Sequence, residues 1–144
     1  MKELILKVEQ WATESNLRYK APLEPQYRAL KIFTDDLIVM KKQGVNISTM
    51  KEQIGDIIVI SIISKLMLID KLSIAKEYYE FFNGKKYVFN SSHLDEIDNC
   101  VNIAKDISKS IGISNITVIA KLSLDHIKQQ PYYMQFRGLE WTYK

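Results

Sequence analysis

The longest apolar stretch of the chain is the feature that most restricts its fold. Residues 54–69 read IGDIIVISIISKLMLI, and nearly every helical face of this stretch is apolar. A helix that is apolar on all sides has to be buried in a protein core or in a membrane. The stretch is interrupted by Asp56, Ser61, Ser64 and Lys65. These residues make it too polar, and it is too short, to span a bilayer. We therefore expect a buried central helix over about residues 49–69.

The rest of the chain also carries apolar residues at helical spacing. We expect helices over about residues 4–16, 25–44, 92–112 and 115–130, and a short one over 70–82. Thr49 and Glu52 have the spacing of a capping box, which would start the central helix at Thr49. Residues 85–90 are expected to form a strand or an extended arm, and residues 131–144 an irregular aromatic tail. With five glycines and three prolines, residues 1–144 are predicted to form one all-α domain, a bundle of about five to six helices.

Composition argues against several classes of function. The formal net charge is +3 and the arginines form no stripe, which argues against a nucleic-acid partner. Cys100 is the single cysteine, so we expect a small core residue and no intramolecular disulfide. His93 and His126 are too far apart for a zinc motif. The first residues lack the pattern of a signal peptide, and we expect a cytoplasmic protein without a membrane segment.

Asp56 needs an explanation, because a carboxylate in an apolar environment is costly unless it is paired. On a helix, Gln53 and Asp56 share one face. The preceding predicted helix carries Asp35 and Asp36 among apolar neighbours. If the two helices pack antiparallel across Gly44, one of these acids could face Asp56. Carboxylates on adjacent helices of a bundle are a way to hold a divalent cation such as Mg²⁺.

The same acid also has a purely structural interpretation. The helix macrodipole stabilises acids near a helix N-terminus. A salt bridge to Lys31, Lys51 or Lys65 would also satisfy the charge of Asp56, and Asp36 could simply face solvent. The spacing of these residues leaves both interpretations open.

Three segments, in this order, resemble the MazG-like nucleotide pyrophosphohydrolases, especially their short phage-type members. They are VEQWATESNL (8–17), PQYRALKIFTDDL (25–37) and KEQIGDIIVISIIS (51–64). SLDHIK (123–128) is more weakly similar to the last helix of that family. Residues 70–116 look like an insertion relative to the short members.

The resemblance implies an all-α bundle that hydrolyses a nucleoside triphosphate to the monophosphate and pyrophosphate with Mg²⁺. It implies the metal ligands Asp35, Asp36, Gln53 and Asp56, with Asp35 and Asp56 as catalytic residues if the site is active. Gln53 stands where the family has a glutamate, and a further glutamate of the motif is aliphatic here, Ile38 or Val39 depending on the alignment. Because this loss of charge weakens the binding of metal and triphosphate, we expect an eroded catalytic site.

The same resemblance directs attention to the C-terminal tail. The family's basic stretch is replaced by Gln129–Tyr133, and Arg137 is the only nearby cation before Lys144. We expect Lys31, Arg137, Tyr132 and Tyr133 as nucleotide-binding residues. Aromatic rings in this tail suit stacking on a base, or packing against the bundle or a dimer mate.

Three functions follow from these patterns. The first is binding of a nucleotide, a nucleotide-derived signal or a protein partner without hydrolysis, by a homodimer or higher homo-oligomer. The alternative is an active Mg²⁺-dependent nucleoside triphosphate pyrophosphohydrolase. A structural or host-directed role, in the host cytoplasm if the protein is phage-encoded, is the third.

Overall fold

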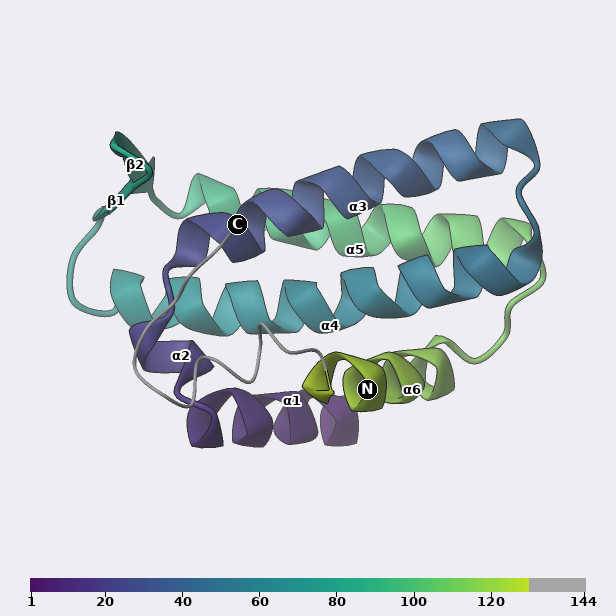
Figure 1. Cartoon of the computed structure of the whole chain (residues 1–144), viewed down its shortest axis with the longest axis horizontal. Coiled ribbons are helices and arrows are strands. Elements are labelled where there is room, and N and C mark those ends of the chain that lie inside the picture. Colours follow the sequence, from purple (N-terminus) through teal and green to yellow (C-terminus); the bar gives the residue numbers. More distant parts are fainter. Residues whose placement is uncertain (130–144) are drawn as a thin grey trace.

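Helices make up most of the computed structural model, which describes residues 1–129. Within this range the elements are, in chain order, α1 (Lys2–Glu14), α2 (Leu17–Lys20), α3 (Leu23–Gln43), α4 (Ile47–Leu72), β1 (Tyr78–Phe82), β2 (Lys85–Phe89), α5 (Ser92–Ser110) and α6 (Ile116–Lys128). Figure 1 shows their arrangement. The helical class predicted from the sequence is confirmed, with the addition of a small two-stranded sheet. The predicted aromatic tail lies outside the described residues.

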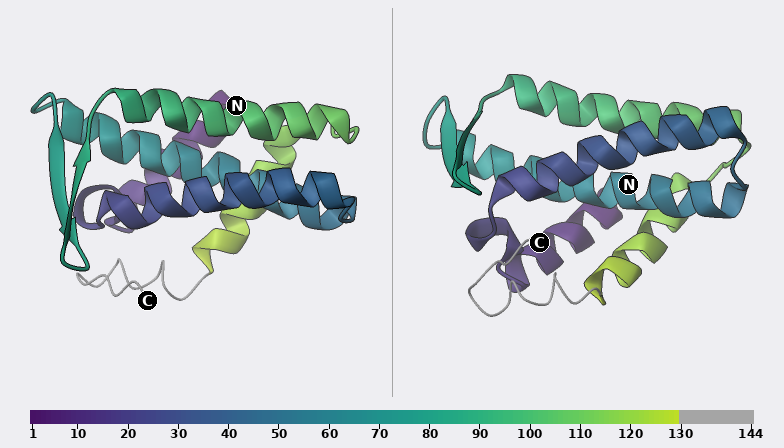
Figure 2. Two further views of the ribbon diagram at one scale, coloured as in Figure 1. Left: turned by 90° about the horizontal axis from the view of Figure 1, so that it is seen from above. Right: turned by 45° about the horizontal axis from the view of Figure 1, so that its top comes forward.

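α4 is the buried centre of the described structure, as its apolar sequence predicts. It packs against α3 and α5 on one side and against α1 and α6 on the other (Figures 1 and 2). Four consecutive residues, Ile57 to Ile60, are all buried, which requires neighbours on every side of the helix. α3 and α4 run antiparallel through a turn at Gly44, whose φ of +68° is the left-handed conformation that glycine favours. No helix among residues 1–129 is long and apolar enough to cross a membrane.

The start of α4 differs from the capping box predicted at Thr49. The N-cap is Asn46, whose side-chain oxygen accepts a hydrogen bond from the backbone N–H of Thr49 at 2.9 Å. An asparagine satisfies the free donors of a first turn as well as a threonine does, so the helix begins earlier than predicted. Asp56 consequently lies about two and a half turns inside α4, beyond the first turn where the macrodipole acts.

The short helix predicted over residues 70–82 is wrong. Residues 70–72 end α4, and Tyr78–Phe82 form β1, which pairs antiparallel with β2 from Tyr78↔Phe89 to Phe82↔Lys85. Asn83 and Gly84 join the strands with φ values of 52° and 75°. Both values are positive, as in the type I′ turn that Asn-Gly favours in tight hairpins. The extended conformation predicted for residues 85–90 is confirmed as β2.

The hairpin is fastened to the start of α3 by Glu80. This side chain is buried, and its carboxylate accepts hydrogen bonds from the backbone N–H groups of Leu23 at 2.8 Å and Glu24 at 2.5 Å. The hydroxyl of Tyr78 donates a further hydrogen bond to it at 2.8 Å. Pro22, the N-cap of α3, supplies no side-chain cap of its own. A carboxylate from a distant strand therefore satisfies donors that a local side chain would normally satisfy.

Candidate functional site

Gly55 allows α6 to pack very closely on α4. A Cβ atom at this position would lie 2.0 Å from Oγ of Ser123 and 2.9 Å from the carbonyl oxygen of Ile119. Real Cβ atoms do not approach other atoms this closely, so the crossing of the two helices requires glycine here. The sequence IGD thus places the acid of Asp56 directly beside a point of close helix–helix contact.

A groove of about 360 Å³ opens next to this crossing, between α4 and α6. Its lining residues are Lys51, Glu52 and Asp56 from α4 and Ile119, Leu122, Ser123 and His126 from α6. Apolar surface dominates the groove, and a few charged and hydroxyl groups converge on it. This combination is typical of small-molecule binding sites.

Asp56 is the half-buried acid of the groove. Burial raises the pKa of its carboxyl to about 6, although a hydrogen bond with Ser123 and the charge of His126 lower it. Glu52 raises the pKa further through like-charge repulsion. The carboxyl therefore changes protonation state close to neutral pH and can act as a donor or an acceptor there.

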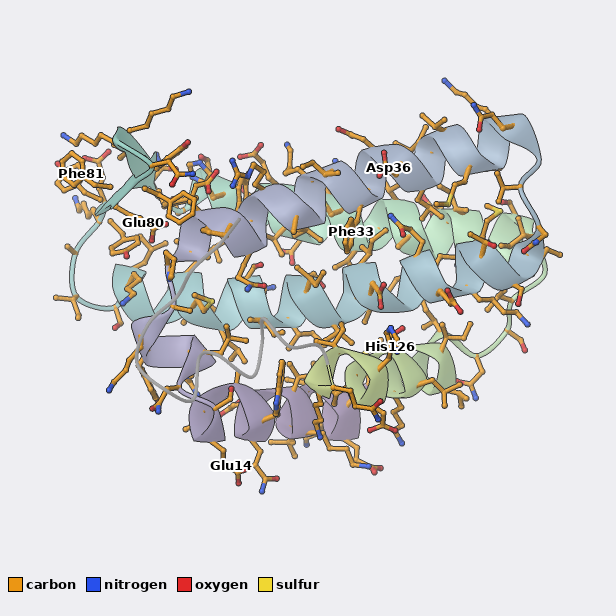
Figure 3. All side chains as sticks on the ribbon, in the orientation of Figure 1. Glu14, Phe33, Asp36, Glu80, Phe81 and His126 are labelled. Carbon is orange, nitrogen blue, oxygen red and sulfur yellow. The ribbon has the colours of Figure 1, made fainter. Side chains whose placement is uncertain are left out.

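The other three predicted metal ligands do not line this groove. Asp35 and Asp36 are exposed on α3. In Figure 3, Asp36 and His126 lie on opposite sides of α4. Gln53 is directed to α3, where its side-chain N–H donates to the carbonyl oxygen of Phe33 at 3.0 Å. The antiparallel packing of α3 and α4 is as expected, but it does not bring these acids to Asp56.

The residues that the family resemblance implies as Mg²⁺ ligands are not gathered into one cluster in this structure. Across residues 1–129, no three side chains of His, Cys, Asp or Glu are grouped so that they could hold a metal ion. Thr34, which directly precedes Asp35 on α3, is buried and donates to the carbonyl oxygen of Leu30 at 2.8 Å. Gln53 and Thr34 thus bond to the backbone of α3, and Asp35 and Asp36 face solvent. Asp56, in contrast, lines the α4–α6 groove.

The lysines considered as partners of Asp56 have separate positions. Lys31 pairs with Glu96 of α5 at 3.2 Å, and Lys65 pairs with Asp98 at 2.8 Å. Lys51 lines the same groove as Asp56. Of the expected nucleotide-binding residues, Tyr132, Tyr133 and Arg137 fall outside the described range.

The sequence alone does not point to a site that contains Glu52, Ser123 or His126. A signal for the α6 residues was present, because Ser123 and His126 are three residues apart and share a helical face. The sequence does not show that α6 packs against α4, because residues 73–115 separate the two helices.

Comparison of the chain with protein-family models, with curated proteins and with solved structures finds no significant match.

Proposed function

We propose that this chain is a MazG-like helical protein that binds a nucleotide or nucleotide-derived ligand in the α4–α6 groove without hydrolysing it. The observation that carries the proposal is the half-buried carboxyl of Asp56 in a largely apolar groove. The three segments that resemble MazG-like proteins suggest the class of ligand, and we propose that this ligand binds in the α4–α6 groove.

The groove has the chemistry that a nucleotide requires. Ile119 and Leu122 offer apolar surface to the faces of a base. Asp56 and Ser123 offer hydrogen-bonding groups to its polar edge, and Lys51 offers a positive charge to a phosphate. A ligand with a flat apolar body, a polar edge and an anionic end matches these three features together.

Binding without hydrolysis is proposed because the acids of the implied metal site are separated. Pyrophosphate release from a triphosphate normally depends on a metal ion that neutralises the developing charge. Asp35 and Asp36 are exposed on α3, whereas Asp56 faces α6. With these acids apart, the groove retains hydrogen-bonding capacity but has no set of acids for a metal among the described residues.

Isothermal titration with a panel of nucleoside mono-, di- and triphosphates tests the proposal. At least one nucleotide should bind to the wild type, and Asp56→Ala should weaken that binding by about tenfold or more. The matched control is the double variant Asp35→Ala/Asp36→Ala, which should bind as the wild type does because both acids lie outside the groove. Failure of every nucleotide to bind would overturn the proposed ligand class.

An assay for pyrophosphate release at saturating Mg²⁺ and Mn²⁺ separates binding from hydrolysis. We expect no turnover by the wild type. Turnover that is lost in the Asp35→Ala/Asp36→Ala variant or with EDTA would instead support the alternative, a pyrophosphohydrolase whose α3 and α4 acids meet around the metal.

The family resemblance also leads us to propose a homodimer or higher homo-oligomer in the cytoplasm, that of a host if the protein is phage-encoded. Light scattering coupled to size-exclusion chromatography measures the number of copies. A monomer at all accessible concentrations would contradict this part of the proposal and leave the groove unaffected.

A further inference from the structure

The outward-facing side of the hairpin exposes large aromatic side chains. Tyr79 and Phe81 are 54% and 76% exposed, and they alternate with the inward-facing Tyr78 and Glu80 along β1. The pairing register places Val88 opposite Tyr79 and Lys86 opposite Phe81. We call the four residues Tyr79, Phe81, Lys86 and Val88 the outer hairpin face. In Figure 3, Phe81 lies at the edge of the molecule, where the hairpin leaves the bundle.

Exposed lysines lie on and near this face. Lys76, Lys85 and Lys86 are all exposed. Lys86 belongs to the outer hairpin face, where its Nζ lies 4.4 Å from the centre of the Tyr79 ring, whereas Lys85 pairs with Phe82 and therefore points to the other face. The acids of the same segment are Glu77, which is exposed, and Glu80, which is buried and bonded to α3. Because Glu80 is buried, the exposed charges of this segment are three lysines against one acid, a local surplus that the whole-chain net charge of +3 does not show.

We propose that the outer hairpin face binds single-stranded nucleic acid. Residues two apart on a strand are separated by roughly 7 Å, so Tyr79 and Phe81 present two aromatic surfaces in a row. Exposed aromatic rings of this kind stack on successive unpaired bases. Lys86 lies on the same face and can contact a phosphate that connects those bases.

The size of the face favours a nucleic-acid strand over a protein partner. Five residues per strand and two strands give a surface of roughly 17 Å by 10 Å. This flat footprint is small for a stable protein interface, in which each partner buries roughly 800 Å² of accessible surface. A short run of nucleotides, in contrast, needs only the two rings and the adjacent charges.

Two other anionic partners are disfavoured by the same structure. The tip of the hairpin is Asn83-Gly84 followed by two lysines, so a membrane approached tip-first would meet four consecutive polar residues. Bases in a duplex are already stacked and paired, so Tyr79 and Phe81 would have to displace them at an energetic cost. Unpaired bases avoid that cost.

Fluorescence anisotropy with labelled oligonucleotides of about 12 nucleotides tests this proposal on the full chain. The wild type should bind single-stranded DNA or RNA more tightly than the corresponding duplex. Phe81→Ala and Tyr79→Ala should each weaken binding by about tenfold, which is the loss expected for one stacked base. Lys86→Glu should weaken binding and flatten its dependence on salt concentration.

Matched variants at the far end of the bundle serve as controls. Val39→Ala changes an exposed apolar residue, and Lys41→Glu/Lys42→Glu changes two exposed lysines, near the end of α3 opposite the hairpin. Both should bind as the wild type does. Because Tyr79 and Phe81 are exposed, their variants should keep the helical circular-dichroism signal of the wild type.

Three results would overturn the proposal. The first is the absence of oligonucleotide binding by the wild type, and the second is unchanged binding by Phe81→Ala and Tyr79→Ala. The third is equal binding of a duplex or of polyglutamate, which would reduce the interaction to general charge attraction. Binding to vesicles of anionic lipid without binding to oligonucleotides would assign the face to a membrane surface instead. The α4–α6 groove does not enter this test, so its outcome is independent of the proposed function.

Discussion

Asp56 combines two properties that are hard to reconcile with a purely structural role. It lies in the most apolar helix of the described chain, and burial raises the pKa of its carboxyl to about 6. A raised carboxyl pKa means that the folded protein disfavours the charged form, so the ionised side chain lowers stability near neutral pH. A residue that lowers stability and lines a groove is a candidate functional residue, because a destabilising side chain can be retained when binding or activity needs it.

We predict that Asp56→Asn raises the free energy of unfolding at pH 7 by about 1–3 kcal/mol. The carboxyl pKa is 3.8 in the reference state and about 6 in the folded protein. The folded state therefore binds more protons between these values, and the wild type loses stability as pH rises from about 4 to about 6. Urea unfolding over this pH range measures the effect. The difference between variant and wild type should shrink at lower pH, and a difference independent of pH would contradict the argument.

Gly55→Ala is predicted to destabilise the protein by about 1–3 kcal/mol. In an open helix the same change stabilises by up to about 1 kcal/mol, so the sign of the effect is itself diagnostic. The reason is the clash of the new Cβ with Ser123 and with the backbone of Ile119. Ser123→Ala removes the nearer contact and leaves the backbone contact. The loss caused by Gly55→Ala should thus be smaller, though still present, in the Ser123→Ala background, as measured by a double-mutant cycle.

At the scale of the elements, the sequence predicted long helices well and the hairpin poorly. The helices α3, α4, α5 and α6 follow from apolar spacing, because each buries one face or, for α4, all faces. The segment EYYEFF is predicted wrongly as helical, because its aromatic residues fit both the 3.6-residue repeat of a helix and the two-residue repeat of a strand. The Asn83-Gly84 pair between alternating apolar residues was the available signal for a hairpin.

The candidate site was predicted less completely for a different reason. Asp56 was identified from its sequence context, but its neighbours depend on which helix crosses α4 at Gly55. Spacing within one helix fixes which residues share a face, whereas it does not say whether that face meets α3 or α6. The predicted contact with Asp35 or Asp36 required the face of Asp56 to meet α3. In the structure this face meets α6.

The attachment of the hairpin to α3 leads to a prediction for Glu80. Glu80→Ala would leave the buried N–H groups of Leu23 and Glu24 without their acceptor, at an expected cost of about 1–3 kcal/mol. Amide hydrogen exchange should become faster in β1 and in the first turn of α3, with little change in α6. Glu77→Ala, which changes an exposed acid of the same segment, is the control. Equal effects of the two variants would mean that Glu80 does not anchor the hairpin.

At the scale of the whole molecule, α4 is the element that the others share. α1, α2, α3, α5 and α6 all pack against it, and α3 and α5 also pack against each other. Because residues on every side of the middle of α4 are buried, a cavity there affects more than one helical pair.

Two isoleucines of α4 provide a matched test of this view. Ile63 is fully buried, whereas Ile69 is 46% exposed on the same helix. Ile63→Ala should lower the free energy of unfolding by about 2–5 kcal/mol, and Ile69→Ala by less than about 1 kcal/mol. Urea unfolding of both variants gives the comparison. Similar losses at the two positions would show that α4 is not the centre of the cooperative unit.

The bond between Glu80 and the start of α3 also has a consequence for the order of events during translation. The first turn of α3 obtains its acceptor from a residue that is synthesised more than fifty positions later. While a nascent chain is still short of that point, the beginning of this helix has to rely on water. The N-terminal half can therefore collapse around α4 early, but its final arrangement at this end has to wait until the hairpin emerges from the ribosome.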